Sequence, residues 1–176
     1  MAPTTLRTLH VRAAAGTRTR GVLVAGPLAI PVALGRGGIR ANKREGDGAT
    51  PRGRFRLVRL WWRADRERKP ATALPCRPIG PRDAWCEDPA DRRYNRHIEI
   101  PAGDPGDRLR RDDHLYDFII EISHNTRPRV TGRGSAVFIH IARPGFVPTA
   151  GCVAMTPARL RHLLERVGPR TEIVVH

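Results

Sequence analysis

Apolar residues occur along the chain mostly in short runs that glycine, proline and charged residues interrupt, a pattern typical of strands. In the first third, the runs at 6–11, 21–26 and 28–35 predict three strands. Pro31 has no amide hydrogen to donate to a neighbouring strand, so we expect the third strand to lie at a sheet edge or to be broken there. A glycine-rich segment then leads into a fourth predicted strand, which begins at Arg54 and alternates apolar residues.

The last third of the chain predicts two more strands, one helix and a closing strand. The runs at 116–123 and 135–142 predict strands, and the second is nearly continuous in apolar residues, which indicates a central position in a sheet. The Thr-Pro pair at 156–157 begins a helix, and the Gly-Pro pair at 168–169 ends it. With a final strand at 171–175, the pattern predicts a mainly β fold. The apolar face of its one amphipathic helix consists of Leu160, Leu163, Leu164 and Val167.

Residues 64–113 break this pattern with many prolines and charges and few apolar residues. A segment of this length without regular structure is often a functional lid or is disordered. Trp85 and Tyr94 favour a lid that packs on the rest of the chain, because large aromatic side chains gain free energy mainly by burial. A chain of 176 residues fits one domain. We therefore expect a single domain over 1–176, with 64–113 as a lid-like insertion.

The composition adds a strong positive charge to this picture. The net charge is +15, and all but two of the 32 basic residues are arginine. Such an excess favours an anionic partner, either nucleic acid or a carboxylate-rich polymer, and a solvated surface is the alternative. The arginines form no helical basic stripe and no aromatic platform accompanies them, so we expect no nucleic-acid partner.

The hydrophobic residues bear on the cellular compartment. A hydrophobic fraction of 40% is within the range of globular domains. No apolar run is long enough to cross a membrane, and the N-terminal segment lacks the apolar core of a signal peptide. We therefore expect either a cytoplasmic protein or export by a route that the sequence does not show.

The chain has three cysteines, Cys76, Cys86 and Cys152. None belongs to a CxxC pair, and no set of residues has metal-ligand spacing, so we expect neither a metal nor a cofactor. The adjacent carboxylate pairs that begin at Glu87 and Asp112 are interpreted as solvated loop charges. Cys76 and Cys86 could form a disulfide in an oxidising compartment, which the sequence leaves open. Cys152 is unpaired in either case and is a candidate nucleophile.

Cys152 follows a glycine and lies shortly before the predicted helix. Gly151 permits an unusual backbone angle, and amide groups at such a turn can hold an oxyanion. His140 ends a predicted strand, and the loop after it can return to bring the imidazole to the thiol. A histidine that titrates near neutral pH can take the thiol proton, which makes the cysteine nucleophilic. The alternative is a buried thiol at a strand–helix junction with an unrelated histidine.

Two segments resemble the YkuD-type L,D-transpeptidases, a family that remodels peptidoglycan. From His140 to Val153 the chain is similar to the family's histidine, loop and Ser/Thr-His-Gly-Cys-aliphatic pattern. Residues 46–55, GDGATPRGRF, are similar to the family's GDxxTPxGxF stretch. The resemblance implies the family's β-sandwich or barrel, with one helix after the catalytic cysteine.

The resemblance also implies a covalent mechanism. Cys152 would attack the carbonyl at the L-centre of a diaminopimelate residue in a stem peptide and release the following D-residue. His140 would take the thiol proton while the Ile141 carbonyl holds its ring, and the amides of Gly151 and Cys152 would form the oxyanion hole. The implied partners are peptidoglycan stem peptides or muropeptides, and the implied compartment is the periplasm or cell envelope.

The sequence departs from the family pattern at three points. Ala150 replaces the second motif histidine, Ala154 replaces the usual arginine, and the loop after His140 is short. We expect His124 to supply the polar support lost at Ala150, and Arg143 to act as a carboxylate clamp. The acyl donor, a diaminopimelate or an L-Ala–diaminopimelate bond, stays open. Further candidate substrate contacts are Thr149, Asn125, Tyr94 and Ser135.

Three functions are consistent with the sequence. The first is an L,D-transpeptidase that cross-links stem peptides through a thioacyl intermediate on Cys152. The second is an L,D-carboxypeptidase of the same fold that acts on recycled muropeptides, which the lack of a visible signal peptide favours. The third is a non-catalytic basic binding module with an inert cysteine.

Overall fold

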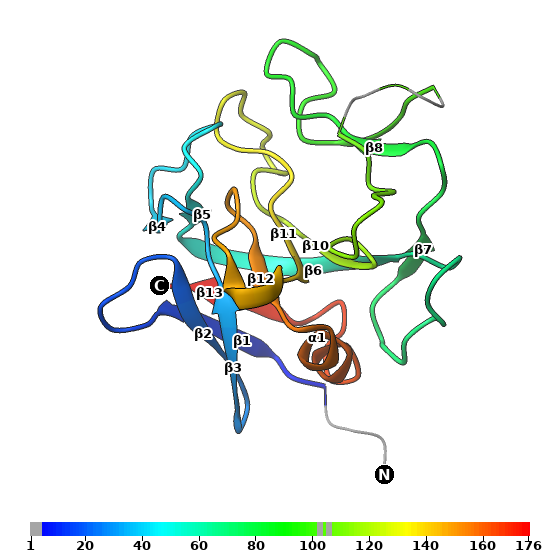
Figure 1. Cartoon of the computed structure of the whole chain (residues 1–176). Coiled ribbons are helices and arrows are strands. Elements are labelled where there is room, and N and C mark those ends of the chain that lie inside the picture. Colours follow the sequence, from blue (N-terminus) through cyan, green and yellow to red (C-terminus); the bar gives the residue numbers. More distant parts are fainter. Residues whose placement is uncertain (1–4, 102–103, 105–106) are drawn as a thin grey trace.

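The computed structural model describes residues 5–101, 104 and 107–176. This part of the chain is mainly β, as the sequence predicts, with one α-helix, α1 (Pro157–Leu164), and one 3-10 turn, η1 (Pro144–Phe146). The strands are β1 (Thr8–Ala13), β2 (Arg20–Ala25), β3 (Leu28–Ala33), β4 (Ile39–Arg40), β5 (Thr50–Pro51), β6 (Gly53–Trp62), β7 (Cys76–Pro78), β8 (Asp83–Trp85), β9 (His97–Glu99), β10 (Phe118–Ile122), β11 (Phe138–Ile141), β12 (Val153–Met155) and β13 (Glu172–Val175) (Figure 1).

One large sheet closes on itself. Its nine strands follow the order β10-β11-β12-β3-β2-β1-β13-β6-β7, and β10 also pairs with β6. That antiparallel pairing runs from Phe118 opposite Trp62 to Ile122 opposite Leu57. Closure of this kind removes the unpaired edges that an open sheet leaves. The fold is therefore barrel-like, with β7 attached to the outside of β6 and two small sheets, β4–β5 and β8–β9, at its rim.

The predicted strands overlap β1, β2, β3, β6, β10, β11 and β13. Pro31 lies in β3 opposite Val22 of β2, and its ring is exposed. On its other side β3 meets β12 only at Ala33, which pairs with Ala154, so the strand behaves as an edge at Pro31, as expected. The sequence pattern did not predict β12, because three residues between a loop and a helix are too few to show alternation.

Alternation along β11 and β12 divides their side chains between two hydrophobic clusters. Ile139 and Ile141 belong to the larger cluster, which fills the closed sheet. Phe138 and Cys152 belong to the smaller cluster on the opposite face. Because side chains alternate along a strand, His140 lies on the same face as Phe138. The larger cluster also contains Val153, Met155 and the buried face of α1, Leu160, Leu163 and Leu164.

The helix begins where the sequence predicts, with Thr156 at the N-cap and Pro157 in the first turn. The Thr156 side chain makes no capping hydrogen bond, although threonine at an N-cap is expected to accept one from the first turn of the helix. The helix ends at Leu164, earlier than the apolar spacing predicts. Val167 is nevertheless buried in the larger cluster, because the following turn carries it back over the core.

Residues 64–113 are more ordered than the sequence predicts. They contain β7, which pairs in parallel with β6, and the antiparallel pair β8–β9. Trp85 and Tyr94 are buried, as their size indicated. In Figure 1 the part of this segment around β8 lies on the side of the sheet opposite α1, whereas the loop before β7 returns beside α1, where Glu67 pairs with Arg161. The absence of apolar alternation hid these strands, since each is only three residues long.

All three cysteines are free thiols, and the disulfide between Cys76 and Cys86 that the sequence left open is not formed. Cys76 lies in β7 and is half-buried, whereas Cys86 follows β8 and is buried. Within the described residues, no helix is long and apolar enough to cross a membrane.

Candidate active site

His140 and Cys152 are diagonal neighbours on one sheet face. The parallel strands β11 and β12 place Ile139 opposite Val153 and His140 opposite Ala154. Cys152 therefore lies two residues before the position opposite His140, and the two side chains share a face. Diagonal neighbours in sheets are about 7–8 Å apart. Both side chains line one cavity of about 230 Å³.

The Cys152 thiol is held by the main chain of the neighbouring strand. Its Sγ donates to the Ala136 carbonyl at 3.3 Å and accepts from the Phe138 amide at 3.3 Å. Burial raises the pKa of the thiol to about 12; the negative charge of Glu87 adds to this rise, and the Phe138 amide and the positive charge of Lys43 oppose it. At neutral pH the unliganded protein therefore carries a neutral thiol.

The His140 imidazole is fixed in one tautomer. Its Nδ1 donates to the Ile141 carbonyl at 2.8 Å, so the proton resides on Nδ1 and Nε2 has a free lone pair. The ring of Tyr116 packs edge-on against the imidazole, with 5.3 Å between centroids. Burial lowers the pKa of His140 to about 4. The histidine is therefore neutral at pH 7 and able to accept a proton at Nε2.

The turn before Cys152 is stabilised by Thr149. The Gly151 amide donates to the Thr149 hydroxyl at 3.1 Å, and that hydroxyl donates to the Cys152 carbonyl at 2.7 Å. Gly151 has a φ of 143°, and a Cβ atom there would lie 2.8 Å from the Ala49 carbonyl oxygen. The turn therefore requires glycine, and the GDGATP segment packs directly against it.

A second cavity, of about 750 Å³, adjoins the first and shares Arg111, Tyr116 and Ala150 with it. Burial raises the pKa of Glu87 to about 7, and the negative charges of Asp107 and Glu45 contribute to the rise. Asp112 is exposed, which agrees with its interpretation as a solvated loop charge, whereas Glu87 is half-buried; both line this cavity. Its charged lining residues are Glu87, Asp107, Asp112 and Asp113, with Arg108, Arg110 and Arg111.

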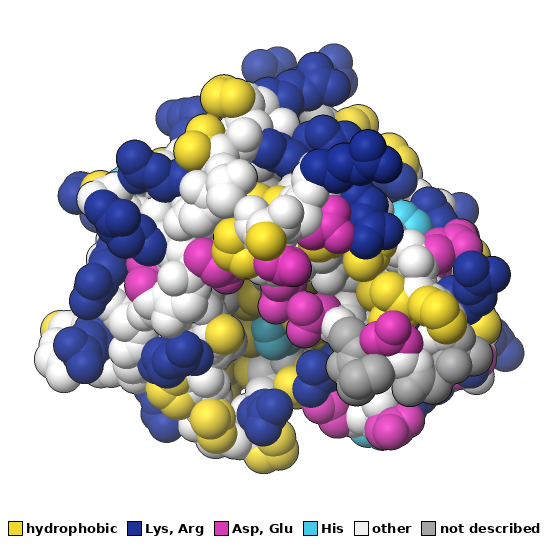
Figure 2. All heavy atoms as spheres, turned by 90° about the horizontal axis from the view of Figure 1, so that it is seen from above, with side chains coloured by type: hydrophobic (Ala, Val, Ile, Leu, Met, Phe, Trp, Pro, Cys, Tyr) yellow, Lys and Arg dark blue, Asp and Glu magenta, His cyan; other side chains and the backbone are white. Residues whose placement is uncertain are grey.

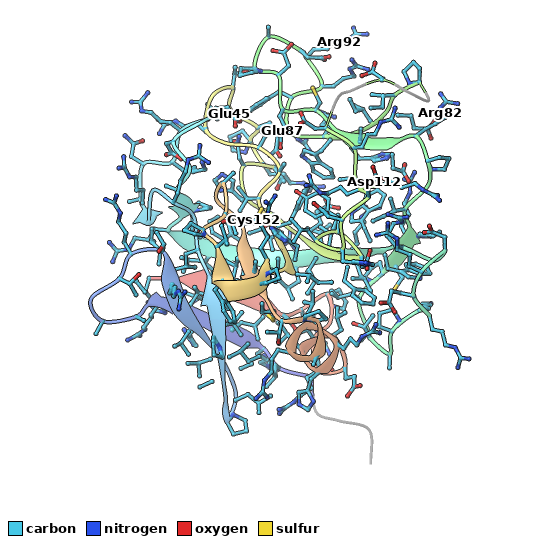
Figure 3. The ribbon with its side chains drawn as sticks, in the orientation of Figure 1. Glu45, Arg82, Glu87, Arg92, Asp112 and Cys152 are labelled. Atoms are coloured by element: carbon cyan, nitrogen blue, oxygen red, sulfur yellow. The ribbon has the colours of Figure 1, made fainter. Side chains whose placement is uncertain are left out.

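Figure 2 shows the same feature on the surface. Acidic side chains gather around a central hollow with a histidine ring deep inside it, whereas lysine and arginine side chains dominate the surrounding surface. In Figure 3, Glu45 and Glu87 lie above Cys152, and Arg82 and Arg92 lie at the periphery. Carboxylates are thus concentrated at this hollow although the protein as a whole is strongly basic, which sequence composition could not reveal.

Tyr94 and Ser135 lie behind this site and line neither cavity. The Tyr94 hydroxyl donates to Glu45 and accepts from the Gly134 amide at 3.0 Å. The Ser135 hydroxyl donates to the same Glu45 carboxylate at 2.7 Å. Burial raises the pKa of Tyr94, and the Glu45 carboxylate raises it further. These two candidate substrate contacts are therefore part of a network that fixes the loop before β11.

His124 and Asn125 also lie outside both cavities. His124 donates from Nε2 to the Arg133 carbonyl at 3.1 Å and packs edge-on against Phe55 at 5.3 Å. Asn125 donates to the carbonyls of Val130 and Gly134 and accepts from the Val130 amide. His124 does not line the cavity that contains Ala150 and Cys152, and its imidazole lies instead against the turn at Gly134. Both residues close the loop between β10 and β11.

Arg143 and Thr149 line the cavity that contains Cys152. Arg143 is exposed, and within the described chain its guanidinium makes no hydrogen bond or ion pair, so it is available to a carboxylate at the cavity mouth. Arg111 lines both cavities, pairs with Asp113 at 2.7 Å and lies over the Tyr116 ring. Sequence reasoning missed both residues, since nothing distinguishes Arg111 from the other arginines of the irregular segment and Tyr116 was assigned to the predicted strand 116–123.

The described residues contain no cluster of three or more histidine, cysteine or acidic side chains that could hold a metal ion. The chemistry that the site offers is therefore best described from its thiol, its imidazole and its carboxylates.

The chain is similar to known proteins over most of its length. The model of the family described as the L,D-transpeptidase catalytic domain (YkuD) matches residues 15–175. No curated protein matches the chain. An L,D-transpeptidase from Mycobacterium smegmatis is a similar solved structure, with 13% identity, a TM-score of 0.46, and coverage of 96% of this chain and 58% of that one. L,D-transpeptidase 3 from Mycobacterium tuberculosis, in complex with a faropenem-derived adduct, has 10% identity, a TM-score of 0.43, and coverage of 96% and 60%. The chain thus spans less than two thirds of the length of these two structures.

Proposed function

The chain belongs to the YkuD family of L,D-transpeptidase catalytic domains, and we propose that it transfers the acyl group of a peptidoglycan stem peptide to an amine through a thioester on Cys152. The observation that carries the proposal is that Cys152 and His140 line one cavity, with the imidazole proton on Nδ1 and Nε2 free. A cysteine nucleophile needs a base in this state.

In the first half-reaction, His140 Nε2 takes the thiol proton as Cys152 Sγ bonds to the substrate carbonyl carbon. The carbonyl oxygen becomes an oxyanion, and collapse of this intermediate breaks the C–N bond. The leaving amine takes the proton from His140, which leaves a thioester and a neutral imidazole. In the second half-reaction, an acceptor amine attacks the thioester carbon and gives a proton to His140. The C–S bond then breaks, and the thiolate regains its proton.

The oxyanion requires preorganised donors near Cys152. The Cys152 amide takes part in none of the loop hydrogen bonds of the described chain, so it is available as one donor. The Gly151 amide is bound to the Thr149 hydroxyl and could serve as a second donor if it exchanges that partner. Arg143 and Arg111 are placed to receive a carboxylate of the acyl donor at the cavity mouth.

The carboxylates of the larger cavity next to Cys152 favour transfer to an amine over hydrolysis. An acceptor amine arrives as an ammonium, which the carboxylates of Glu87, Asp107 and Asp112 can attract, and it releases one proton to solvent before the neutral amine attacks the thioester. Water needs no such recognition. The runner-up function, an L,D-carboxypeptidase acting on muropeptides, would use the same thioester. An envelope location suits transfer between stems, and a cytoplasmic one suits muropeptide recycling.

The proposal is tested with purified protein, disaccharide-tetrapeptide and a carbapenem, followed by intact mass and product analysis. We expect a covalent adduct on the wild type, no adduct on Cys152→Ala, and dimeric muropeptides as products. Monomeric tripeptide products alone would favour the carboxypeptidase. Neither adduct nor turnover, together with tight and salt-sensitive binding to DNA, would identify a basic binding module instead.

A further inference from the structure

Lys43 is a buried cation that the proposed reaction does not yet use. It lies in the loop between β4 and β5 and is 6% exposed. Its Nζ pairs with Asp47 at 2.5 Å and donates to the Arg44 carbonyl at 2.9 Å. The Asp47 carboxylate also accepts from the amides of Arg44 and Ala49, each at 2.8 Å. A buried ammonium with this support has one defined position.

That position lies between two glycine turns that surround Cys152. At Gly134, a Cβ atom would lie 3.0 Å from both Cγ and Cε of Lys43. At Gly151, a Cβ atom would lie 3.7 Å from Lys43 Nζ and 2.8 Å from the Ala49 carbonyl. Both glycines have positive φ, 97° and 143°. The Lys43 side chain therefore lies against both turns, together with the His124 imidazole at Gly134 and the Ala49 carbonyl at Gly151.

Both turns determine the surroundings of the thiol. Gly134 leads into the segment whose Ala136 carbonyl accepts from Cys152 Sγ, and Gly151 directly precedes Cys152. The positive charge of Lys43 acts on the thiol and lowers its pKa, against the larger effect of burial. Asp47 and the Arg44 carbonyl accept two of the three hydrogen bonds that the ammonium can donate. Its positive charge remains close enough to Cys152 to stabilise a thiolate there.

We propose that Lys43 is a positioning residue for Cys152: its side chain holds the turns at Gly134 and Gly151, and its ammonium stabilises the thiolate that forms on Cys152. The inference rests on the proposed role of Cys152 as nucleophile. It gives a physical reason for a buried lysine beside the GDGATP segment, because a thiolate formed in a dry cavity needs a nearby positive charge.

The test is the rate at which iodoacetamide alkylates Cys152 between pH 7 and pH 9, measured by mass spectrometry of its peptide. We expect Lys43→Met to slow alkylation about threefold. A rise of about one pKa unit lowers the thiolate fraction tenfold, and the greater nucleophilicity of a more basic thiolate restores part of the rate. The control Lys69→Met removes the same charge from an exposed position and should leave the rate unchanged.

Lys43→Met leaves Asp47 buried without its partner, so folding is checked by the alkylation of Cys86, which is buried and reacts faster if the chain opens. The double variant Lys43→Met/Asp47→Asn contains no unpaired charge and decides the question if the single variant does not fold. We expect the double variant to be slow as well. Wild-type alkylation of Cys152 in either folded variant would overturn the inference. Alkylation of Cys152 needs no stem peptide and therefore reports the effect of Lys43 even if the enzyme shows no turnover. A wild type whose Cys152 is alkylated normally but which turns over no stem peptide would contradict the proposed function alone.

Discussion

His140 and Cys152 share one face of the parallel strands β11 and β12, yet each hydrogen bonds to main-chain atoms and not to the other. Burial stabilises the neutral form of both groups, since it lowers the pKa of the imidazole and raises that of the thiol. The resting site therefore holds a neutral thiol beside a neutral base. We therefore expect the Cys152 proton to pass to His140 during acylation, and not before the substrate reacts.

The first prediction concerns stability and pH. The folded pKa of His140, about 4, is below its unfolded value of 6.5, so the unfolded state binds more protons in this range. The contribution of His140 to the unfolding free energy is thus lost as pH falls from 6.5 toward 4, by about 2 kcal/mol between pH 7 and pH 5. Glu87, whose folded pKa of about 7 lies above its ordinary value of 4.5, acts in the opposite direction over the same range.

Urea unfolding at several pH values separates these two effects. In the wild type they partly cancel and give a shallow profile between pH 5 and pH 7. His140→Asn should become more stable relative to the wild type as pH falls, and Glu87→Gln less stable. Parallel profiles for all three proteins would contradict the assignment of either group as a buried titrating side chain.

The second prediction concerns the acceptor. Glu87→Gln removes a charge from the larger cavity, and we expect the KM for an amine acceptor to rise several-fold at pH 8. In the wild type this KM should fall as pH rises through about 7, because Glu87 then ionises, and the variant should lose that dependence. The measurement is transfer from a tetrapeptide donor to a free diamine. Asp88→Asn is the matched control, because Asp88 is adjacent but exposed and does not line the cavity. An equal effect of both substitutions would show that the cavity does not recognise the amine.

The third prediction concerns the cysteine turn. Gly151→Ala places a Cβ atom 2.8 Å from the Ala49 carbonyl at a φ that side chains rarely adopt, so Cys152 must move. A displacement of about 1 Å at a reacting group can lower the rate about 100-fold, which is the fall in kcat/KM that we expect. Gly145→Ala is the control, since Gly145 also has positive φ but its Cβ would meet open space. We expect Gly145→Ala to lower the unfolding free energy by about 1 kcal/mol and to leave kcat/KM nearly unchanged.

The fourth prediction separates structure from substrate binding at Tyr94. Tyr94→Phe leaves the buried Gly134 amide without a partner and removes a donor from Glu45. We expect the unfolding free energy to fall by about 1–3 kcal/mol, with an unchanged KM for the acyl donor. Tyr116→Phe provides the contrast, because the Tyr116 hydroxyl makes no hydrogen bond within the described residues but its ring lines both cavities. Its stability should equal that of the wild type. A raised KM in Tyr94→Phe would restore Tyr94 as a substrate contact.

Particular residues show how far sequence reasoning extends. The nearly continuous apolar run at 135–142 was enough to predict a central strand, because a strand buried on both faces carries apolar residues at almost every position; only the structure separated its two faces. Gly151 and the spacing of His140 and Cys152 indicated the reactive pair. His124 was expected to support the site because it lies in a turn directly after a predicted strand; in the fold its ring hydrogen bonds to the Arg133 carbonyl and packs against Phe55.

By itself, the sequence determined the mainly β fold, the helix after the cysteine and the thiol–imidazole pair, since each depends on contacts between residues near in sequence or on a local motif. Only the tertiary structure decided that carboxylates from 87 and 107–113 line a cavity beside Cys152 and that Lys43 lies beneath Gly151. Those residues lie in segments without periodicity, and their positions follow from the way the long segment packs on the outer face of β6, β10 and β11. In a chain of net charge +15, a group of carboxylates beside the cysteine arises from such packing and cannot be inferred from the composition.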